Sequence, residues 1–138
     1  MSQSNIEKFD YYAGVILARL YEAFPFEIDL DTQAMADELA SKNPQPKGSD
    51  ELAFVGAVLD FLLEYDFIKA SPLVGGSFSD VRLTLKGLGV LKSVPPSIDQ
   101  KHKSNGELLK QAAQSGAKSL LANATQALIS TYIQSFKF

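Results

Sequence analysis

The segment Ser49-Asp-Glu-Leu-Ala-Phe-Val-Gly-Ala-Val-Leu-Asp-Phe-Leu-Leu-Glu-Tyr-Asp-Phe-Ile68 decides the fold. Ser49 is a typical N-cap residue, and the two acids after it occupy the first turn, where the helix dipole favours negative charge. Apolar side chains then occupy nearly every side of the predicted helix, which we expect to end near Tyr65. A helix that is apolar nearly all round is buried on more than one side, so we expect this one at the centre of a domain.

The chain around this segment has 138 residues, of which 46% are hydrophobic and 21% charged, as is typical of one globular domain. It contains no cysteine, which excludes a thiol nucleophile, a thiolate zinc site and a redox switch. No apolar stretch approaches the length of about 18 residues that spans a bilayer. The N-terminus lacks the basic-then-apolar pattern of a secretory signal. We therefore expect a cytoplasmic location.

A helix, a strand and a second helix are predicted before the central segment. Ser4 and Glu7 have the spacing of a capping box, in which the two residues satisfy each other's free backbone N–H groups. Pro25 cannot continue the helix that they begin. Asp31 or Thr32 provides a cap for the second helix. The expected bounds of the three elements are Ser4–Phe24, Phe26–Leu30 and Thr32–Ser41.

A β-hairpin and a short helix are predicted after the central segment. The strands are expected over Phe67–Ser71 and Asp80–Thr84, with Gly75-Gly76 in the loop between them. A helix then begins near Thr84. Two prolines and a polar run follow, so we expect a first domain over residues 1–96, a linker over 97–103 and a helical segment over 104–138.

The C-terminal segment is predicted to be a long amphipathic helix, approximately Ser104–Phe136, which opens on a second capping-box pair, Ser104 and Glu107. An unbroken helix of this length would measure about 48 Å at about 1.5 Å per residue, so it either bends near Gly116 or protrudes from the domain. Its apolar face consists of Leu109, Ala113, Gly116, Ala117, Leu120, Leu121, Ala124, Leu128 and Tyr132.

Three roles are open for this helix: it folds back onto the domain, it pairs with a second copy of the chain, or it lies on a membrane surface. Small residues such as Ala113, Gly116 and Ala117 suit a close approach of two helices. Helices at membrane surfaces instead carry Trp, Phe and Leu opposite many basic residues. We therefore expect folding back or self-association rather than membrane association.

Two segments of the sequence are typical of one family of small domains. Val58-Leu-Asp-Phe-Leu-Leu-Glu-Tyr-Asp-Phe-Ile68 has the form of a helix that runs into a strand, and Arg82-Leu-Thr-Leu-Lys-Gly-Leu-Gly-Val-Leu91 has the form of a strand that runs into a helix. With the predicted order of elements, residues 5–94 resemble a winged-helix (winged helix-turn-helix) domain. The resemblance implies a mainly α fold with a small β-hairpin wing, to which this chain adds the long C-terminal helix.

The resemblance also implies that the third helix enters the DNA major groove, but this sequence departs from the family there. Helices that read DNA contact phosphates and base edges through Arg, Lys, Asn, Gln and Ser. The third helix, from Asp50 to Tyr65, has no Arg, Lys, Asn or Gln. We expect its outward side to bind protein instead, through a partner or a second copy of the chain. The candidate interface residues are Asp50, Glu51, Phe54, Ala57, Asp60, Phe61, Leu63 and Glu64.

The charge pattern bears on the alternative, a DNA-binding transcriptional regulator that acts as a dimer. The formal net charge is −3, and the stretch from Glu27 to Asp66 has 10 acids against 2 lysines. Such a stretch repels a polyanion, so DNA binding would depend on cations elsewhere. The candidates for phosphate contacts are Lys69, Arg82, Lys101, Lys103, Lys110 and Lys118.

Catalytic and metal-binding patterns are weak in this chain. The one histidine, His102, lies between two lysines in the expected linker. Glu27, Asp29 and Asp31 alternate along a strand, which does not give the converging loop that a hard cation needs. The pair Gly75-Gly76 fits neither of the phosphate-binding glycine motifs, G-x-G-x-x-G and the loop that ends in G-K-[ST]. We expect a non-enzymatic protein with no cofactor and no metal.

Overall fold

The computed structural model describes residues 4–73, 77–93 and 103–134 of the chain. These residues form six helices and three strands, which make a mainly helical fold with a small antiparallel sheet. In chain order they are α1 (Asn5–Ala23), β1 (Ile28–Leu30), α2 (Thr32–Lys42), α3 (Glu51–Glu64), β2 (Ile68–Pro72), β3 (Phe78–Leu83), α4 (Leu85–Lys92), α5 (Asn105–Ser115) and α6 (Lys118–Gln134).

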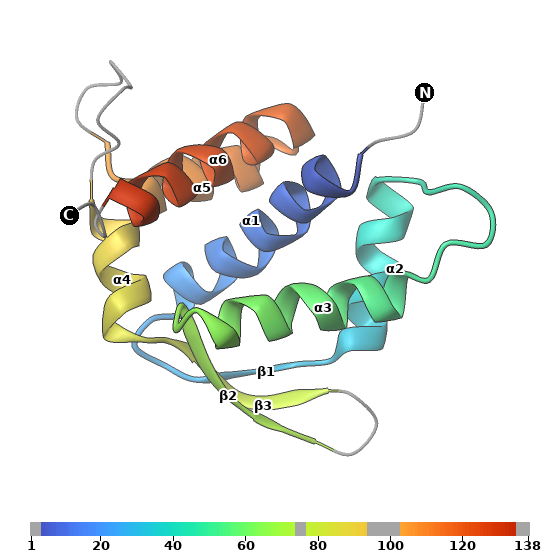
Figure 1. Cartoon of the computed structure of the whole chain (residues 1–138), viewed down its shortest axis with the longest axis horizontal. Helices are drawn as coiled ribbons and strands as arrows, with labels where there is room; N and C mark the ends of the chain where they lie inside the picture. The colour runs from blue at the N-terminus through green and yellow to red at the C-terminus, as the bar shows by residue number, and fades with distance from the viewer. Residues whose placement is uncertain (1–3, 74–76, 94–102, 135–138) are drawn as a thin grey trace.

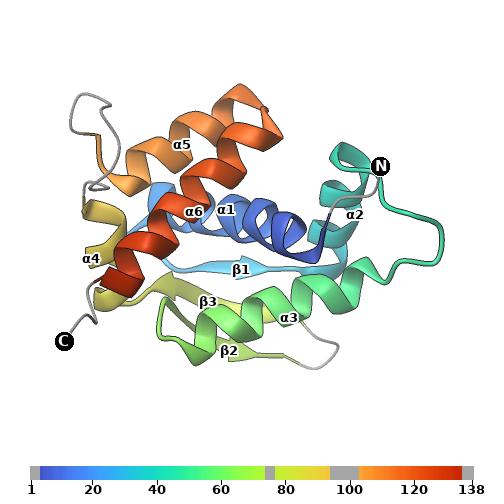
Figure 2. The ribbon, with the colours of Figure 1, turned by 45° about the horizontal axis from the view of Figure 1, so that its top comes forward.

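Helix α1 lies at the centre of the molecule (Figure 1). The α5–α6 pair packs on one side of α1, whereas α3 and the sheet lie on the other side (Figure 2). The strands follow the order β1-β3-β2, so β1 joins the β2–β3 hairpin at its β3 edge. The fully buried side chains come from both sides of α1, and the largest are Tyr12, Ile16, Leu17, Leu20, Leu39, Leu59, Leu91, Leu109 and Leu128.

The helix caps agree with the sequence at most ends. The capping box is confirmed: Ser4 Oγ accepts a hydrogen bond from the backbone N–H of Glu7 at 3.1 Å, and Glu7 Oε1 accepts one from the N–H of Ser4 at 3.1 Å. Asp31 caps α2. The predicted cap of the central helix is off by one residue, because Asp50 Oδ1, and not the Ser49 hydroxyl, accepts from the N–H of Ala53 at 3.0 Å.

The β-hairpin is also confirmed, with bounds that differ from the prediction by one or two residues. Strand β2 pairs with β3 in an antiparallel register that places Lys69 opposite Arg82. The predicted strand at Phe26–Leu30 is shorter than expected and pairs with β3 through Ile28 and Leu30. The predicted Gly75-Gly76 loop lies outside the described residues.

The position of Gly87 explains why the segment Arg82–Leu91, which runs from a strand into a helix, needs a glycine there. Its N–H donates to Thr84 Oγ1 at 2.9 Å, which caps α4. A Cβ atom at Gly87 would lie 2.2 Å from the carbonyl oxygen of Phe67, so only glycine fits between the start of α4 and the residue before β2. This contact fixes α4 directly against the hairpin.

The prediction of a single long C-terminal helix is wrong. The helix is interrupted at Gly116, which adopts a left-handed conformation with φ of 74° and ends α5. Ser104 caps α5 as expected. Helix α6 then runs back along α5, and both pack on α1, so the segment folds back onto the rest of the chain. The expected linker over 97–103 lies outside the described residues except for Lys103.

Candidate functional site on the outward side of α3

Helix α3 has one buried and one exposed side. The buried side chains are Val55, Val58, Leu59 and Leu62. On the opposite side lie six exposed residues that we call the α3 face: Asp50, Ala53, Ala57, Asp60, Phe61 and Glu64. The exposed side of α3 thus presents three carboxylates, two alanines and one phenyl ring.

Phe61 is the large apolar side chain of the α3 face. It is 43% exposed. Its ring meets the ring of Phe9 edge-on, with 5.2 Å between the centroids, and lies 4.7 Å from the ring of Tyr65, itself 41% exposed. Aromatic contacts of this kind hold a ring in a defined position. Phe61 is therefore a pre-positioned apolar group at the C-terminal end of the face.

Phe54 and Leu63 are less exposed than the sequence suggested, and both pack partly against the core. The Phe54 ring stands at 85° to the ring of Tyr12, with a centroid separation of 5.3 Å. The ammonium of Lys8 lies 4.3 Å from the Phe54 centroid, a cation–π contact. Phe54 is covered by α1 and Leu63 packs partly against the core, so these two residues support the helix rather than extend the α3 face.

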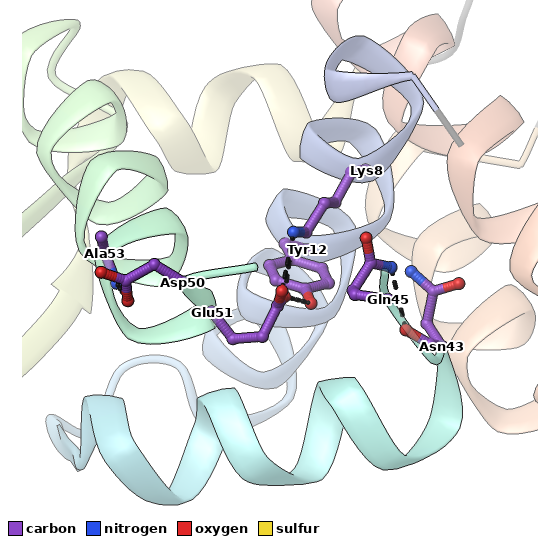
Figure 3. A network of polar contacts seen from close by, with 7 residues as sticks. All are labelled: Lys8, Tyr12, Asn43, Gln45, Asp50, Glu51 and Ala53. Atoms are coloured by element: carbon purple, nitrogen blue, oxygen red, sulfur yellow. Dashed lines mark hydrogen bonds and ion pairs between the residues drawn. The ribbon is translucent and has the colours of Figure 1, made fainter. Parts of the chain in front are cut away.

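Glu51 also differs from the prediction that it belongs to an acidic rim. Its carboxylate points toward α1, as Figure 3 shows, and lies 3.0 Å from the ammonium of Lys8. The exposed fractions of the Lys8 and Glu51 side chains are 7% and 13%. The Tyr12 hydroxyl donates to Glu51 Oε1 at 2.5 Å. This buried network ties the first turn of α3 to α1.

The network fixes the protonation state of Tyr12. Burial and the adjacent Glu51 carboxylate raise the pKa of the Tyr12 hydroxyl above its ordinary value, so it remains a hydrogen-bond donor at neutral pH. Neither Lys8 nor Tyr12 was predicted from the sequence as part of a functional site. Their spacing of four residues places both on the same side of α1, but burial of the lysine depends on Glu51, 43 residues away.

A hollow of about 550 Å³ adjoins the α3 face, between α2 and the N-terminus of α3. Its acidic side chains are Asp37, Asp50 and Glu51. Among the described residues that line it, none is a lysine or an arginine. Asp37 and Asp50, which are both exposed, therefore extend the acidic character of the α3 face around its N-terminal end.

None of the described candidate cations for phosphate contacts belongs to the α3 face. Lys69 on β2 forms an ion pair with Glu27 at 3.2 Å, and Arg82 lies opposite it on β3. Lys103 donates to the side chain of Gln111 at 2.9 Å. Lys110 is half-buried on α5, and Lys118 begins α6. Lys101 lies outside the described residues.

The residues predicted for self-association are divided between core and surface. Leu109, Leu121, Ala124 and Leu128 are buried within the chain, so they are not available to a second copy. Ala113, Ala117 and Tyr132 are half-buried, whereas Gly116 and Leu120 are exposed. The buried members pack where α5 and α6 meet α1.

The alternating acids of the first strand serve separate structural purposes. Glu27 pairs with Lys69, Asp29 Oδ1 accepts from the N–H of Asp80 at 3.2 Å, and Asp31 caps α2. Within residues 4–73, 77–93 and 103–134, no group of three His, Cys, Asp or Glu side chains converges as a metal site would require. His102 lies outside this part of the chain.

Over the same described ranges, every helix is too short or too polar to cross a bilayer. Comparison with known proteins gives no family to which the chain can be assigned: it matches no family model, no curated protein and no solved structure.

Proposed function

We propose that this chain is a non-enzymatic winged-helix protein that binds another protein through the α3 face. The order helix–strand–helix–helix–hairpin–helix and the sheet order β1-β3-β2 support the winged-helix assignment. In such a domain α3 takes the position of the groove-reading helix. Its outward side is the surface on which the function depends.

The observation that carries the proposal is the composition of the α3 face. Phe61 offers an exposed ring in a fixed position, and Asp60 and Glu64 lie beside it on the same side of the helix. Burial of a fully exposed phenyl side chain contributes about 1.5–3 kcal/mol, and binding would cover the 43% of Phe61 that is still exposed. Carboxylates around an apolar centre select a complementary basic surface. The partner is therefore a protein with an apolar pocket bordered by Lys or Arg.

The partner is a different protein rather than a second copy of the chain. A symmetric dimer through the α3 face would place the same carboxylates opposite each other across the two-fold axis. Like charges in that position oppose association. Helices α5 and α6, which carry Lys110 and Lys118, pack on α1 of their own chain.

Nucleic acid fits this face poorly. DNA affinity depends on the release of counterions by Lys and Arg at phosphates. The α3 face contains no cation, and Lys69 on the neighbouring hairpin pairs with Glu27. Duplex DNA would meet the carboxylates of Asp50, Asp60 and Glu64 at the position where a groove reader places its basic side chains.

Site-specific photocrosslinking in cells tests the proposal. A benzoylphenylalanine residue replaces Phe61, and a matched control replaces Ile133, which is 62% exposed on α6. We expect a defined protein adduct from position 61 that position 133 does not give. The crosslinked peptide of that protein, identified by mass spectrometry, should be rich in Lys or Arg. Adducts with nucleic acid alone, or the same adducts from both positions, would overturn the proposal.

A further inference from the structure

The structure contains a cavity on the side of α1 away from the α3 face. It lies between α1, α2 and the turn that joins α5 to α6, and has a volume of about 490 Å³. Pockets for small organic molecules commonly measure about 300–1,000 Å³. The apolar part of its wall includes Val15, Ala18, Leu39, Ala112, Ala113 and Leu121.

Small residues create this space. Ala112, Ala113, Gly116 and Ala117 lie where α5 ends and α6 begins, and all four line the cavity. The sequence suggested that the stripe from Ala113 to Ala117 brings two helices close together. It instead lines a hollow beside α1 and α2, where larger side chains would fill the volume.

Tyr11 supplies a hydroxyl group in the wall. The residue is 6% exposed and lines the cavity. Among the described residues, no hydrogen bond is made by its hydroxyl. Burial raises the pKa of the Tyr11 hydroxyl, so it carries its proton at neutral pH and is available as a donor. This hydroxyl has a free donor, and a ligand oxygen that enters the cavity can accept a hydrogen bond from it.

The charged groups of the wall favour an anion. Arg19 and Lys42 both pair with Glu38, the latter at 3.2 Å, and Lys118 donates to Asn43 Oδ1 at 3.0 Å. With Glu22, the lining contains three cations and two carboxylates, which leaves one net positive charge. The chain as a whole has a net charge of −3, so this is a locally positive region of an acidic protein.

We propose that the cavity binds a small monocarboxylate with an unbranched aliphatic chain. The chain occupies the space beside the alanines, and the carboxylate accepts from the Tyr11 hydroxyl and balances the excess positive charge of Arg19, Lys42 and Lys118. A single negative charge matches the lining, and the apolar wall excludes a small hydrophilic anion. This site is separate from the α3 face and does not depend on its partner.

Calorimetric titration of the full chain tests the proposal, with octanoate as the probe. 1-Octanol and octylamine have the same chain length with a neutral and a positive head group. We expect octanoate to bind about tenfold more tightly than 1-octanol, the effect of a hydrogen bond to a charged group. Octylamine should give no binding heat. No heat from octanoate at millimolar concentration, or equal affinity for octanoate and 1-octanol, would overturn the proposal.

Two variants locate the binding. Tyr11→Phe removes the hydroxyl and should weaken octanoate binding about tenfold, whereas Tyr65→Phe, at an exposed tyrosine, should leave it unchanged. Ala113→Leu fills the cavity and should abolish binding without lowering the melting temperature. Ala127→Leu, at a half-buried alanine that is not part of the cavity wall, is its control. If octanoate binds Tyr11→Phe or Ala113→Leu as it binds the unmodified chain, the site is elsewhere and the proposal is wrong.

Discussion

The ammonium of Lys8 on α1 lies 3.0 Å from the carboxylate of Glu51 on α3, and both side chains are almost completely enclosed. Removal of one partner from a buried ion pair leaves an uncompensated charge, which typically costs about 3–5 kcal/mol. We therefore expect Glu51→Ala to lower the free energy of unfolding by about that amount, as measured by urea denaturation.

The double variant Lys8→Met/Glu51→Leu separates the charge effect from packing. Replacement of a buried pair by apolar side chains of similar size is often neutral, so the double variant should recover most of the lost stability. Glu64→Ala, at an exposed glutamate of the same helix, should change stability by less than about 0.5 kcal/mol. A double variant as unstable as Glu51→Ala would contradict this account of the network.

Asp10 is a buried carboxyl whose charge opposes folding. It is 3% exposed and accepts a hydrogen bond from Gln126 Nε2 at 3.1 Å. Burial raises the pKa of Asp10 above its ordinary value. Asp10→Asn keeps an oxygen for Gln126 and removes the charge. We expect it to raise the melting temperature at neutral pH by about 3–5 °C, the shift that about 1 kcal/mol causes in a domain of this size.

The raised pKa of Asp10 also sets the pH dependence of the rise in melting temperature expected for Asp10→Asn. A carboxyl with a raised pKa in the folded state takes up its proton before the unfolded chain does, so acid stabilises the folded form through this group. The advantage of Asp10→Asn should therefore shrink as the pH falls through the raised pKa of Asp10. Asp37 is a matched control, because it is exposed and accepts from Gln33 at 3.0 Å. A gain for Asp37→Asn equal to that for Asp10→Asn would refute the role of burial.

Gly14 marks a close approach of α1 and α6. A Cβ atom at this position would lie 2.5 Å from Thr125 Oγ1 and 3.0 Å from Leu121 Cγ. The Thr125 hydroxyl is buried and donates to the carbonyl of Leu121 at 3.0 Å, so it does not yield easily. We expect Gly14→Ala to destabilise the chain by about 1–3 kcal/mol, the usual cost of overpacking, in a denaturant titration.

Gly89 on α4 provides the control for this prediction. It is exposed, and a Cβ atom there meets no heavy atom within 4 Å. Alanine is preferred to glycine in a helix by up to about 1 kcal/mol, so Gly89→Ala should stabilise the chain. The two substitutions therefore have opposite predicted signs. A stabilising Gly14→Ala would show that α6 does not pack on α1 as described.

The elements with strong local signals were predictable from the sequence. The capping box at Ser4, the proline after the first helix and the cap at Asp31 place the first two helices within one or two residues of their observed ends. Local hydrogen bonds and backbone restrictions determine these positions, and a sequence shows both. The acidic, cation-free side of α3 was predictable for the same reason, because helical periodicity alone places Asp60, Phe61 and Glu64 together.

The features that the sequence did not predict have a common physical cause, since each depends on a contact between distant parts of the chain. Burial of Glu51 requires Lys8, which lies 43 residues earlier in the sequence. Gly116 could either bend the last helix or break it, and the packing of α6 on α1 decides in favour of a break. The cavity beside Tyr11 depends on three helices at once, so no local pattern in the sequence predicts it.

A titration with duplex DNA at low salt distinguishes the proposed function from DNA binding. We expect the unmodified chain to give no change in fluorescence anisotropy of a labelled duplex, because the α3 face holds carboxylates where phosphate contacts would form. Asp60→Lys/Glu64→Lys reverses both charges beside Phe61 and should introduce weak binding that disappears as salt is raised. Binding by the unmodified chain that weakens steeply with salt would support the alternative of a DNA-binding regulator.

The most direct test of the central claim is the yield of the protein crosslink from position 61 when the neighbouring charges are reversed. With Asp60→Lys/Glu64→Lys the yield of the adduct should fall at least about tenfold, because two attractive contacts with a basic partner become repulsive. With Asp37→Lys/Gln33→Lys, a pair of exposed changes on α2, the reduction should be smaller. An unchanged yield in the α3 variant, or a crosslink to nucleic acid from the unmodified face, would contradict the account.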